Sequence, residues 1–314
     1  MKLTTAVVVP SYNHETFVGE AIQSALDQTR APDEVIVVDD GSTDDSRVIL
    51  ESVRAPAFRV LLQPNLGAHA ALNRGIAESK ADLIFILNSD DSFAPERVDH
   101  FARLFEADAE LALAGSWLEV VDGSGRRLAV KEAWHNLEPW PLGPPEHTFQ
   151  GTEDPRANLL QTNYLSTTSN FVFRRSVWER HGPFRPLRYA HDWDFALRVA
   201  RTEKIRIVPS VLLRYRVHDR NTIRENRTAM EFEILWVLAA NVAPYLDPSL
   251  AGAEGNEGRS DFLKRLHASI HTFGHDRVFW LLAVLCSAEG DGAGFRDLLD
   301  PENGLRSWFL ERMR

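Results

Sequence analysis

The sequence predicts an α/β fold in which a mostly parallel sheet is flanked by helices and followed by a helical C-terminal extension. Short runs of β-branched and other apolar residues alternate with segments whose apolar residues recur at helical spacing, an order typical of βαβ units. Acidic residues follow several of these runs directly, where parallel strands leave the sheet. From about residue 229 onward, strand-like runs give way to helical spacing with Gly- and Glu-rich breaks.

The first part of the chain contains four predicted strands with helices between them. Residues 6–9 are β-branched or small and end at Pro10, and apolar positions over residues 17–26 follow helical spacing. The segment Asn65-Leu66-Gly67 is expected to open a later helix. The other strands are predicted at residues 34–38, 58–62 and 83–87, and the other helices around residues 48–50 and 70–77. This order predicts parallel pairing, because parallel strands need such crossover connections.

The middle of the chain is less regular. A helix is expected to begin at Pro95, and a hairpin is predicted where two apolar runs flank Asp122-Gly123-Ser124-Gly125. The remaining strands are predicted at residues 111–115, 117–121, 128–130, 169–173, 205–208 and 211–217, and the remaining helices at residues 176–180 and 191–202. Residues 134–163 show no pattern, and so long an irregular stretch inside a compact domain is usually functional or mobile.

The composition is that of a soluble globular protein, with 44% hydrophobic and 25% charged residues. A formal net charge of −10 argues against a broad nucleic-acid surface, so no nucleic-acid partner is expected. The single cysteine, Cys286, excludes an intrachain disulfide and fits a reducing compartment. The N-terminal apolar run is too short for a signal peptide, and the later runs are too short to cross a bilayer. We therefore expect a cytoplasmic protein, with peripheral membrane contact left open.

The most informative segment is residues 83–91, where a continuous apolar run ends in Asn88-Ser89-Asp90-Asp91. Such a run suits a strand buried on both faces, and its carboxyl end is where ligands bind in open α/β sheets. Two adjacent ionised carboxylates repel each other unless a cation or water separates them, and oxygen ligands suit Mg²⁺ or Mn²⁺. The alternative is a plain turn in which Asp91 and Ser92 cap the next helix.

Acidic segments also lie at two other predicted strand ends, at Asp39-Asp40 and at Asp192. The dinucleotide fingerprint GxGxxG does not follow the first strand, and the P-loop pattern GxxxxGK[ST] occurs nowhere in the sequence. Both of these classes of nucleotide site therefore lose their main support. A doubly wound sheet with an acidic crevice remains, and an acidic crevice needs a cation to accept a phosphorylated ligand. The residues thus indicate a metal–nucleotide site.

A series of short motifs runs along the first two thirds of the chain. The opening motifs are Val7-Val8-Val9-Pro10-Ser11-Tyr12-Asn13, Ala21-Ile22-Gln23-Ser24-Ala25-Leu26-Asp27-Gln28-Thr29 and Val37-Val38-Asp39-Asp40-Gly41-Ser42-Thr43-Asp44. The later motifs are Asn65-Leu66-Gly67, Asn73-Arg74-Gly75-Ile76, Asn88-Ser89-Asp90-Asp91, Gly182-Pro183-Phe184 and His191-Asp192-Trp193-Asp194. Each motif alone is weak, but in their order and spacing, over roughly residues 4–220, they strongly resemble those of the inverting family 2 glycosyltransferases, which have the GT-A fold.

The resemblance implies a GT-A type (Rossmann-like) fold with two regions. Residues 1–225 would form the GT-A catalytic domain, with a nucleotide-sugar-binding half at residues 1–115 and an acceptor and catalytic half at residues 116–225. Residues 226–314 would form a helical C-terminal region. The implied activity is transfer of a sugar from a nucleotide-diphosphate donor to an acceptor hydroxyl with inversion. The sequence does not identify the acceptor, which is a sugar, a lipid-linked sugar or a protein.

The resemblance also implies roles for single residues. Asp192 matches the general base that takes the proton of the acceptor hydroxyl. Asp90 matches the aspartate that binds Mg²⁺ or Mn²⁺, Asp91 supports it, and related enzymes often place a histidine like His218 at the metal or the diphosphate. The metal would neutralise the diphosphate leaving group. The residues expected at the nucleotide sugar are Pro10, Ser11, Tyr12, Asn13, Asp39, Asp40, Gly67, Asn73, Asn88, Ser89 and Arg216.

Most of these assignments have a structural alternative. Residues 39–42 also form a plain turn sequence, and Asp192 could be the N-cap of an apolar helix. His218 could be structural, and Arg216 could lie on the surface. Trp193 could form a platform for a sugar ring, but core packing fits it better.

Two positions depart from the family pattern. Asn88 occupies the first acidic position of the usual Asp-x-Asp motif and adds no charge at the metal, which favours weaker metal binding. His191 occupies a position that is often Glu, just before the base. His14 and His69 receive no role from the sequence.

Other classes of function compete with the enzyme. A non-catalytic sugar-nucleotide or glycan-binding module on the same fold is favoured slightly by Asn88 and opposed by the retained carboxylates. A nucleotidyltransferase on a similar fold would need a Gly-rich loop bearing Arg or Lys after the first strand, and residues 11–14 are not such a loop. The C-terminal helices could act as a scaffold that forms a homo-oligomer or packs on the catalytic domain.

Overall fold

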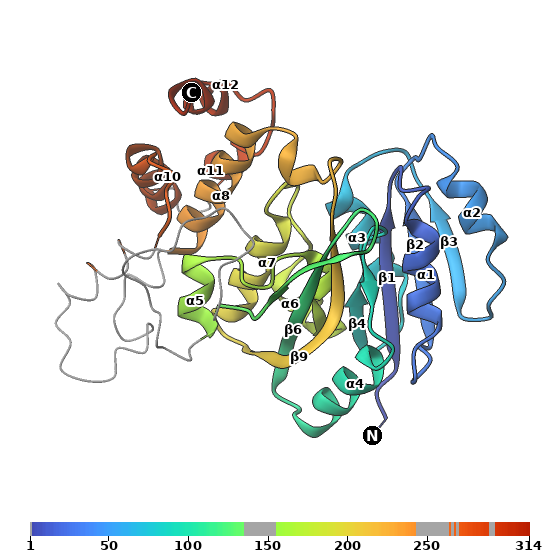
Figure 1. The fold of residues 1–314 in the computed structure, drawn as a ribbon. Helices are drawn as coiled ribbons and strands as arrows, with labels where there is room; N and C mark the ends of the chain where they lie inside the picture. The colour runs from blue at the N-terminus through green and yellow to red at the C-terminus, as the bar shows by residue number, and fades with distance from the viewer. Residues whose placement is uncertain (1, 135–154, 243–263, 265–266, 268–269, 289–292) are drawn as a thin grey trace. The chain divides into compact units, whose positions relative to one another are not determined.

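Figure 1 shows a computed structural model of the chain, which describes residues 2–134, 155–242, 264, 267, 270–288 and 293–314. The chain divides into two compact units. The first unit comprises Met1–Leu142, Leu165–Phe184 and Thr202–His218, and the second comprises Gly143–Tyr164, Arg185–Arg201 and Asp219–Arg314. The second unit thus takes segments from the middle of the chain as well as its C-terminal part.

The first unit is built on one sheet, which has nine strands within the described residues. Its order is β3-β2-β1-β4-β8-β6-β9-β5, with β7 paired to β6. The strands are β1 (Thr5–Ser11), β2 (Glu34–Asp39), β3 (Phe58–Leu62), β4 (Leu83–Ile86), β5 (Ser92–Phe93), β6 (Leu111–Asp122), β7 (Arg127–Lys131), β8 (Val172–Arg174) and β9 (Lys204–Val217). The helices of this unit are α1 (Val18–Leu26), α2 (Ser46–Ser52), α3 (Ala68–Glu78), α4 (Arg97–Ala107) and α6 (Arg175–His181).

The N-terminal half of the sheet is parallel, as the alternation of strands and helices predicts. β1 pairs in parallel with β2 and β4, and β2 pairs in parallel with β3. Every residue of β1 and β4 is buried, which explains their continuous apolar sequences. α3 packs closely on β1 because position 75 has no side chain: a Cβ on Gly75 would lie 2.5 Å from Val8 Cγ1. The predicted α/β class is confirmed.

Four of the strands predicted in the second half merge into two long ones. Residues 111–115 and 117–121 form β6, and residues 205–208 and 211–217 form β9. β6 and β9 pair in parallel, but their register shifts near the middle: Ser116 pairs with Val208, whereas the next residue, Trp117, pairs with Val211. Pro209 therefore lies in a bulge, where a residue without an N–H costs no ladder hydrogen bond. The predicted hairpin between β6 and β7 is confirmed.

Two other predicted boundaries shift. The strand predicted at residues 169–173 starts with a 3₁₀ helix, η1 (Thr168–Asn170), before β8 begins. The side chain of Asn170 bonds the backbone of Ser116 in β6, which replaces part of a strand ladder. β8 is antiparallel to both β4 and β6. The helix predicted from Pro95 begins at Arg97, as α4, after the short strand β5.

The second unit is helical. Its described helices are α5 (Pro155–Gln161), α7 (His191–Ala200), α8 (Arg227–Val242), α10 (Asp276–Ala288), α11 (Ala293–Asp297), α12 (Gly304–Arg312) and the 3₁₀ helix η2 (Thr222–Arg224). α8 is buried along most of its length and packs against α7, α10 and α12. Trp236 of α8 stacks on Phe295 of α11 at 4.7 Å between ring centroids. In the described residues the C-terminal region is helical, as predicted; the break predicted at residues 252–258 lies outside them.

The irregular stretch predicted at residues 134–163 lies mostly outside the described residues, and the helix α5 occupies part of its end. Within the described part of the chain, no helix combines the length and apolar composition that spanning a membrane requires.

Candidate functional site

The first group of site residues lies where β1 and β2 end side by side. Ser11, which follows Pro10, pairs with Asp39 in the parallel register, and the Asp40 N–H donates to the Ser11 carbonyl (2.8 Å). Ser11 and Asp39 are 2% and 1% exposed. Oδ1 of Asp39 accepts a hydrogen bond from the Ser42 N–H (3.1 Å). Oδ2 of Asp39 and Oγ of Ser11 are buried without a hydrogen-bond partner among the described residues.

These two unpartnered atoms suit a ligand. A buried polar group without a partner costs about 1–3 kcal/mol, so most proteins do not leave one. The carboxylate of Asp39 can accept a hydrogen bond, and the hydroxyl of Ser11 can donate or accept one. A ligand group with an N–H and a hydroxyl or carbonyl would therefore recover free energy by binding here.

Asp40 has a different role, because its carboxylate is occupied by protein donors. It accepts hydrogen bonds from Gln63 Nε2 (2.7 Å), from the Leu66 N–H (2.9 Å) and from the Gly67 N–H (2.8 Å). These bonds fix the loop before α3 against the end of β2. Gly67 itself has φ +92°, a conformation that favours glycine. Asp40 and Gly67 thus shape the loop beside Asp39.

Asn13 links the loop after β1 to the loop after β2. Its side-chain Oδ1 accepts from the Thr43 N–H (2.8 Å), and its own N–H donates to Ser42 Oγ (3.0 Å). Asn13 has φ +53°, which asparagine tolerates better than most residues. The preceding Tyr12 side chain is 43% exposed and lies at the rim of this pair of loops.

A second group of site residues brings together three side chains that can ligate a metal. One ligand atom each from His14, Asp90 and His218 lies within 4.8 Å of the others. His14 follows β1, Asp90 follows β4, and His218 follows β9. His218 Nε2 lies 3.1 Å from Asp90 Oδ2, and the rings of the two histidines lie 5.8 Å apart, edge to face. A set of two imidazoles and one carboxylate fits a divalent cation.

The two adjacent aspartates have opposite electrostatic environments. Burial alone would raise the pKa of Asp90, but its hydrogen bond with His218 and the nearby charge of His14 outweigh burial and lower the pKa. Burial, followed by repulsion from Asp90, raises the pKa of Asp91 well above its ordinary value. Asp90 is therefore the more readily ionised of the two carboxylates, as a cation ligand would have to be.

Asp91 is not part of the three-residue cluster. Its Oδ2 accepts hydrogen bonds from Ser169 Oγ (2.5 Å) and Thr167 Oγ1 (3.4 Å), and its Oδ1 accepts from the Arg216 N–H (2.9 Å). It is 2% exposed. These bonds connect the end of β4 to η1 and to β9, so Asp91 positions the residue before it. It also does not cap α4, whose N-cap residue is Glu96.

Asn88 and Ser89 precede the cluster and also bond protein groups. The Asn88 N–H donates to Ser169 Oγ (2.8 Å), and Asn88 Nδ2 donates to Thr167 Oγ1 (3.0 Å). Ser89 Oγ lies 2.7 Å from His14 Nδ1. The amide at position 88 can donate in this way, whereas a carboxylate could not, which gives the departure from Asp-x-Asp a structural use.

Arg216 is buried, so the alternative that it lies on the surface is wrong. Its side chain is 5% exposed and forms an ion pair with Glu20 (2.7 Å). Nε donates to the Asp90 carbonyl (3.0 Å), and the guanidinium lies 5.0 Å from the Phe17 ring centroid. The Phe17 ring in turn lies 4.9 Å from that of His218. Arg216 therefore fixes the backbone and the rings around the cluster.

A fully buried arginine, which the sequence analysis did not single out, lies under this network. Arg97 donates to Ser116 Oγ (3.0 Å) and to the Ser169 carbonyl (3.2 Å), and its guanidinium lies over the rings of Phe93 and Phe101. Burial lowers its pKa to about 9, so the group stays charged at neutral pH. No local pattern marks this position in the sequence, because an arginine near a helix N-terminus is usually exposed.

Asn73 is also occupied by protein partners within the first unit. Its Nδ2 donates to the Phe184 carbonyl (2.9 Å), while its Oδ1 accepts from the Phe184 N–H (2.8 Å) and from Trp178 Nε1 (3.1 Å). The motifs at residues 73–76 and 182–184 thus meet through the side chain of Asn73.

Asp192 lies in the second unit, as the second residue of α7, so the prediction that it follows a strand is wrong: the element before α7 is the helix α6. The N-cap of this helix is Ala190, so Asp192 is not the N-cap. Asn163 Nδ2 donates to its Oδ2 (3.0 Å), and the Trp193 N–H contacts its Oδ1 (2.7 Å). Oδ1 of Asn163 is buried without a hydrogen-bond partner among the described residues. Trp193 packs in the core and donates from Nε1 to the Leu159 carbonyl (2.7 Å), as the packing alternative predicts.

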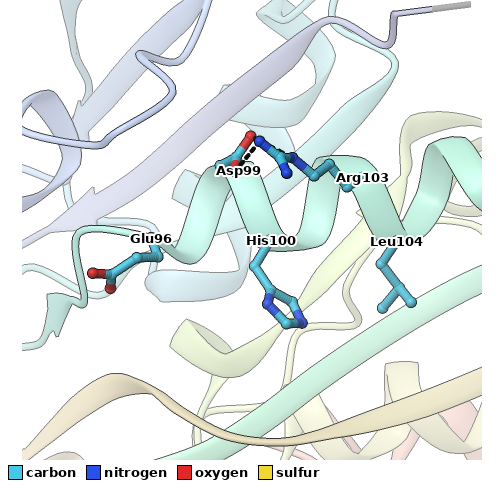
Figure 2. A pocket seen from close by; sticks show the side chains of 5 residues that line it. All are labelled: Glu96, Asp99, His100, Arg103 and Leu104. Atoms are coloured by element: carbon cyan, nitrogen blue, oxygen red, sulfur yellow. Dashed lines mark hydrogen bonds and ion pairs between the residues drawn. The ribbon is translucent and has the colours of Figure 1, made fainter.

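A hollow on the surface of α4 is separate from these groups. It has a volume of about 390 Å³ and is lined by one face of the helix, as Figure 2 shows. The lining residues are Glu96, Asp99, His100, Arg103 and Leu104. None of the predicted site residues lines it, so it is not the candidate site.

The sequence matches the model of the family described as Glycosyl transferase family 2 over residues 6–182. The chain therefore belongs to this family. An uncharacterized glycosyltransferase of Nostoc sp. (strain PCC 7120 / SAG 25.82 / UTEX 2576) is 26% identical over 224 residues, which cover 69% of this chain and 65% of that protein. EpsH of Bacillus subtilis (strain 168), also named as a glycosyltransferase, is 26% identical over 301 residues, covering 90% of this chain and 83% of EpsH.

Solved structures of similar fold include residues 1–349 of TarS from S. aureus. The complex of TarS with UDP-GlcNAc has a TM-score of 0.64 at 17% identity and covers 99% of this chain and 89% of that one. The complex of TarS with UDP has a TM-score of 0.59, also at 17% identity, and covers 96% and 82%. The GT-A type of fold is thereby confirmed.

Proposed function

We propose that the chain transfers a sugar from a nucleotide-diphosphate donor to an acceptor hydroxyl, with inversion at the anomeric carbon and with a divalent metal. One observation carries the proposal: Ser11 Oγ and Asp39 Oδ2, buried and without a hydrogen-bond partner among the described residues, lie at the same sheet edge as the cluster of His14, Asp90 and His218. The first group suits the base and ribose of a nucleotide, and the second suits a metal-bound diphosphate. That TarS of similar fold binds UDP-GlcNAc supports a UDP-sugar as the donor to test first.

The first unit would hold the donor. Asp39 would accept a hydrogen bond from a base N–H through Oδ2, and Ser11 would bond a polar group of the nucleoside. Asp90 and His218 would hold the cation. When bound, the cation would neutralise the negative charge that develops on the departing diphosphate. Arg216 keeps the Asp90 backbone in place through its Nε.

Asp192 would act as the general base. The acceptor oxygen attacks the anomeric carbon on the face opposite the diphosphate, so that a new C–O bond forms while the bond to the diphosphate oxygen breaks. The hydroxyl proton passes to the Asp192 carboxylate, and the released product is a nucleotide diphosphate. Asn163 Nδ2 and the Trp193 N–H contact this carboxylate and fix its orientation. The experiment below tests this role.

Nucleotide-diphosphate release is measured with Mn²⁺ over a panel of nucleotide sugars and hydroxyl acceptors, beginning with UDP-GlcNAc. We expect turnover by the wild type, and at least about 10²-fold slower transfer by Asp192→Asn, with unchanged donor affinity in calorimetry. Asp99→Asn, on the exposed face of α4, is the matched control. Unchanged transfer by Asp192→Asn would remove the base role.

A wild-type protein that binds the donor with metal but transfers nothing to any acceptor would instead be a sugar-nucleotide-binding module. Absence of donor binding across the whole panel would contradict both functions.

A further inference from the structure

The metal cluster contains a ligand that the sequence motifs do not supply. His14 lies one residue after the loop motif of β1, and one of its ring nitrogens lies within 4.8 Å of the ligand atoms of Asp90 and His218. With His14 included, the cluster presents two imidazoles and one carboxylate. Without it, the cluster would present one of each.

The ligand types decide which cations are favoured. Mg²⁺ is a hard cation that prefers oxygen ligands, keeps several waters and loses them reluctantly. Imidazole nitrogen binds first-row transition ions more strongly, and affinity rises from Mn²⁺ through Co²⁺ and Ni²⁺. Each imidazole that replaces an oxygen ligand therefore shifts the preference away from Mg²⁺. The neutral amide of Asn88 shifts it the same way, because the usual first carboxylate of the motif is missing.

The surroundings of both rings are those of fixed ligands. His14 Nδ1 lies 2.7 Å from Ser89 Oγ, the residue next to Asp90. A histidine whose Nδ1–H donates to such an acceptor carries its lone pair on Nε2, and partners of this kind orient metal-binding histidines. The His218 ring lies against Phe17, whose ring also contacts the guanidinium of Arg216. Neither ring is left to rotate on an exposed surface.

We propose that His14, Asp90 and His218 together form a three-ligand site that selects a first-row transition ion over Mg²⁺. This inference rests on the proposed function only for the role of the ion in sugar transfer. The site itself is defined by the three side chains. Three protein ligands leave positions on the ion for phosphate oxygens of a donor. They also predict that the ion binds before any nucleotide is present, because a carboxylate and two imidazoles suffice to hold it.

The test measures metal binding without nucleotide. Isothermal calorimetry of the full chain is carried out with Mg²⁺, Mn²⁺ and Co²⁺, and pulsed electron paramagnetic resonance of the Mn²⁺ complex counts the coordinating nitrogens. We expect affinity to rise in the order Mg²⁺, Mn²⁺, Co²⁺, with Mn²⁺ bound at least about 10-fold more tightly than Mg²⁺. We expect two nitrogen couplings in the wild type.

His14→Gln and His218→Gln should each lose one nitrogen coupling and weaken Mn²⁺ binding by at least about 10-fold, a loss that even supporting residues of metal ligands produce. His100→Gln, on the surface of α4, is the matched control and should retain both couplings and full affinity. Circular dichroism establishes that each variant is folded, and either ligand variant alone suffices for the test.

Two coupled nitrogens in His14→Gln, or equal affinity of the wild type for Mg²⁺ and Mn²⁺, would overturn the proposal. The experiment involves no sugar transfer, so it separates the two hypotheses. A protein that shows two nitrogen couplings but never releases a nucleotide diphosphate fails the proposed function alone. A protein that turns over a donor with Mg²⁺ and shows one nitrogen coupling fails this inference alone.

Discussion

At the scale of single residues, the site is marked by atoms that cost stability in the free protein. Ser11 Oγ and Asp39 Oδ2 are buried and make no hydrogen bond within the described part of the chain, whereas Asp40 beside them makes three. Neighbouring residues in one motif thus have opposite functions. Asp40 fixes the loop, whereas Oδ2 of Asp39 is bonded by none of the described residues, as the proposed nucleotide site requires.

This difference gives the first prediction at the residue scale. Ser11→Ala removes a buried hydroxyl that no described residue satisfies, so the free energy of unfolding should rise by about 1–3 kcal/mol, while donor affinity should fall by about 3- to 10-fold. Ser79→Ala is the matched control, because Ser79 is also buried and its Oγ accepts from the Ala81 N–H (3.1 Å). It should lose about 1 kcal/mol and bind the donor normally. Chemical unfolding measures the free energy of unfolding, and calorimetry measures the donor affinity. A Ser11→Ala variant that is destabilised but binds the donor with full affinity would contradict the role of Ser11 in donor binding.

The sequence allows some of these residues to be predicted and hides others. Asp39 and Asp90 follow apolar strands, and the carboxyl end of a parallel strand is where a ligand-binding side chain is expected. His14 follows a recognisable motif, but its proximity to His218 depends on where β9 ends, and no local pattern gives that. Arg97 is still harder, because the groups that bond its buried guanidinium, Ser116 Oγ and the Ser169 carbonyl, lie far away in the sequence.

At the scale of elements, the sequence predicts the βαβ half better than the rest. Continuous apolar runs locate β1, β2 and β4 because these strands are almost entirely buried, and helical spacing locates the helices between them. β9 is predicted in pieces because its exposure is mixed and Pro209 lies in a bulge, and β6 because the polar Ser116 interrupts its apolar run. η1 is not visible as a helix, because side-chain hydrogen bonds rather than propensity fix it.

A hydrogen bond from Asn163 Nδ2 to Asp192 Oδ2 (3.0 Å) connects the segment after α5 to the first turn of α7. If Asp192 is the base, Asn163→Ala should lower kcat about 10-fold and leave donor affinity unchanged, because the carboxylate loses its orientation while the donor groups lie in the first unit. Asn226→Ala removes an exposed side-chain bond before α8 and serves as the control. Steady-state kinetics and donor calorimetry separate the two effects. A loss confined to donor affinity would contradict the positioning role.

At the scale of the whole molecule, the metal cluster joins segments that are far apart in the sequence. His14, Asp90 and His218 follow β1, β4 and β9, so a bound ion would connect three strand ends that share one sheet.

An ion that binds the folded state and not the unfolded chain stabilises it by mass action, by about 2.7 kcal/mol at a free concentration of 100 times Kd. Removing Mn²⁺ with a chelator should therefore lower the free energy of unfolding of the wild type by about this amount. The double variant His14→Gln, His218→Gln should unfold identically with Mn²⁺ and with chelator, because it retains a single ligand of the cluster. Urea unfolding at the two metal conditions measures the difference, with His100→Gln as the control that keeps the wild-type response. The contradicting outcome is a wild type whose free energy of unfolding is the same with and without Mn²⁺, at concentrations that saturate the electron paramagnetic resonance signal. The ion would then bind elsewhere or bind the unfolded chain equally well.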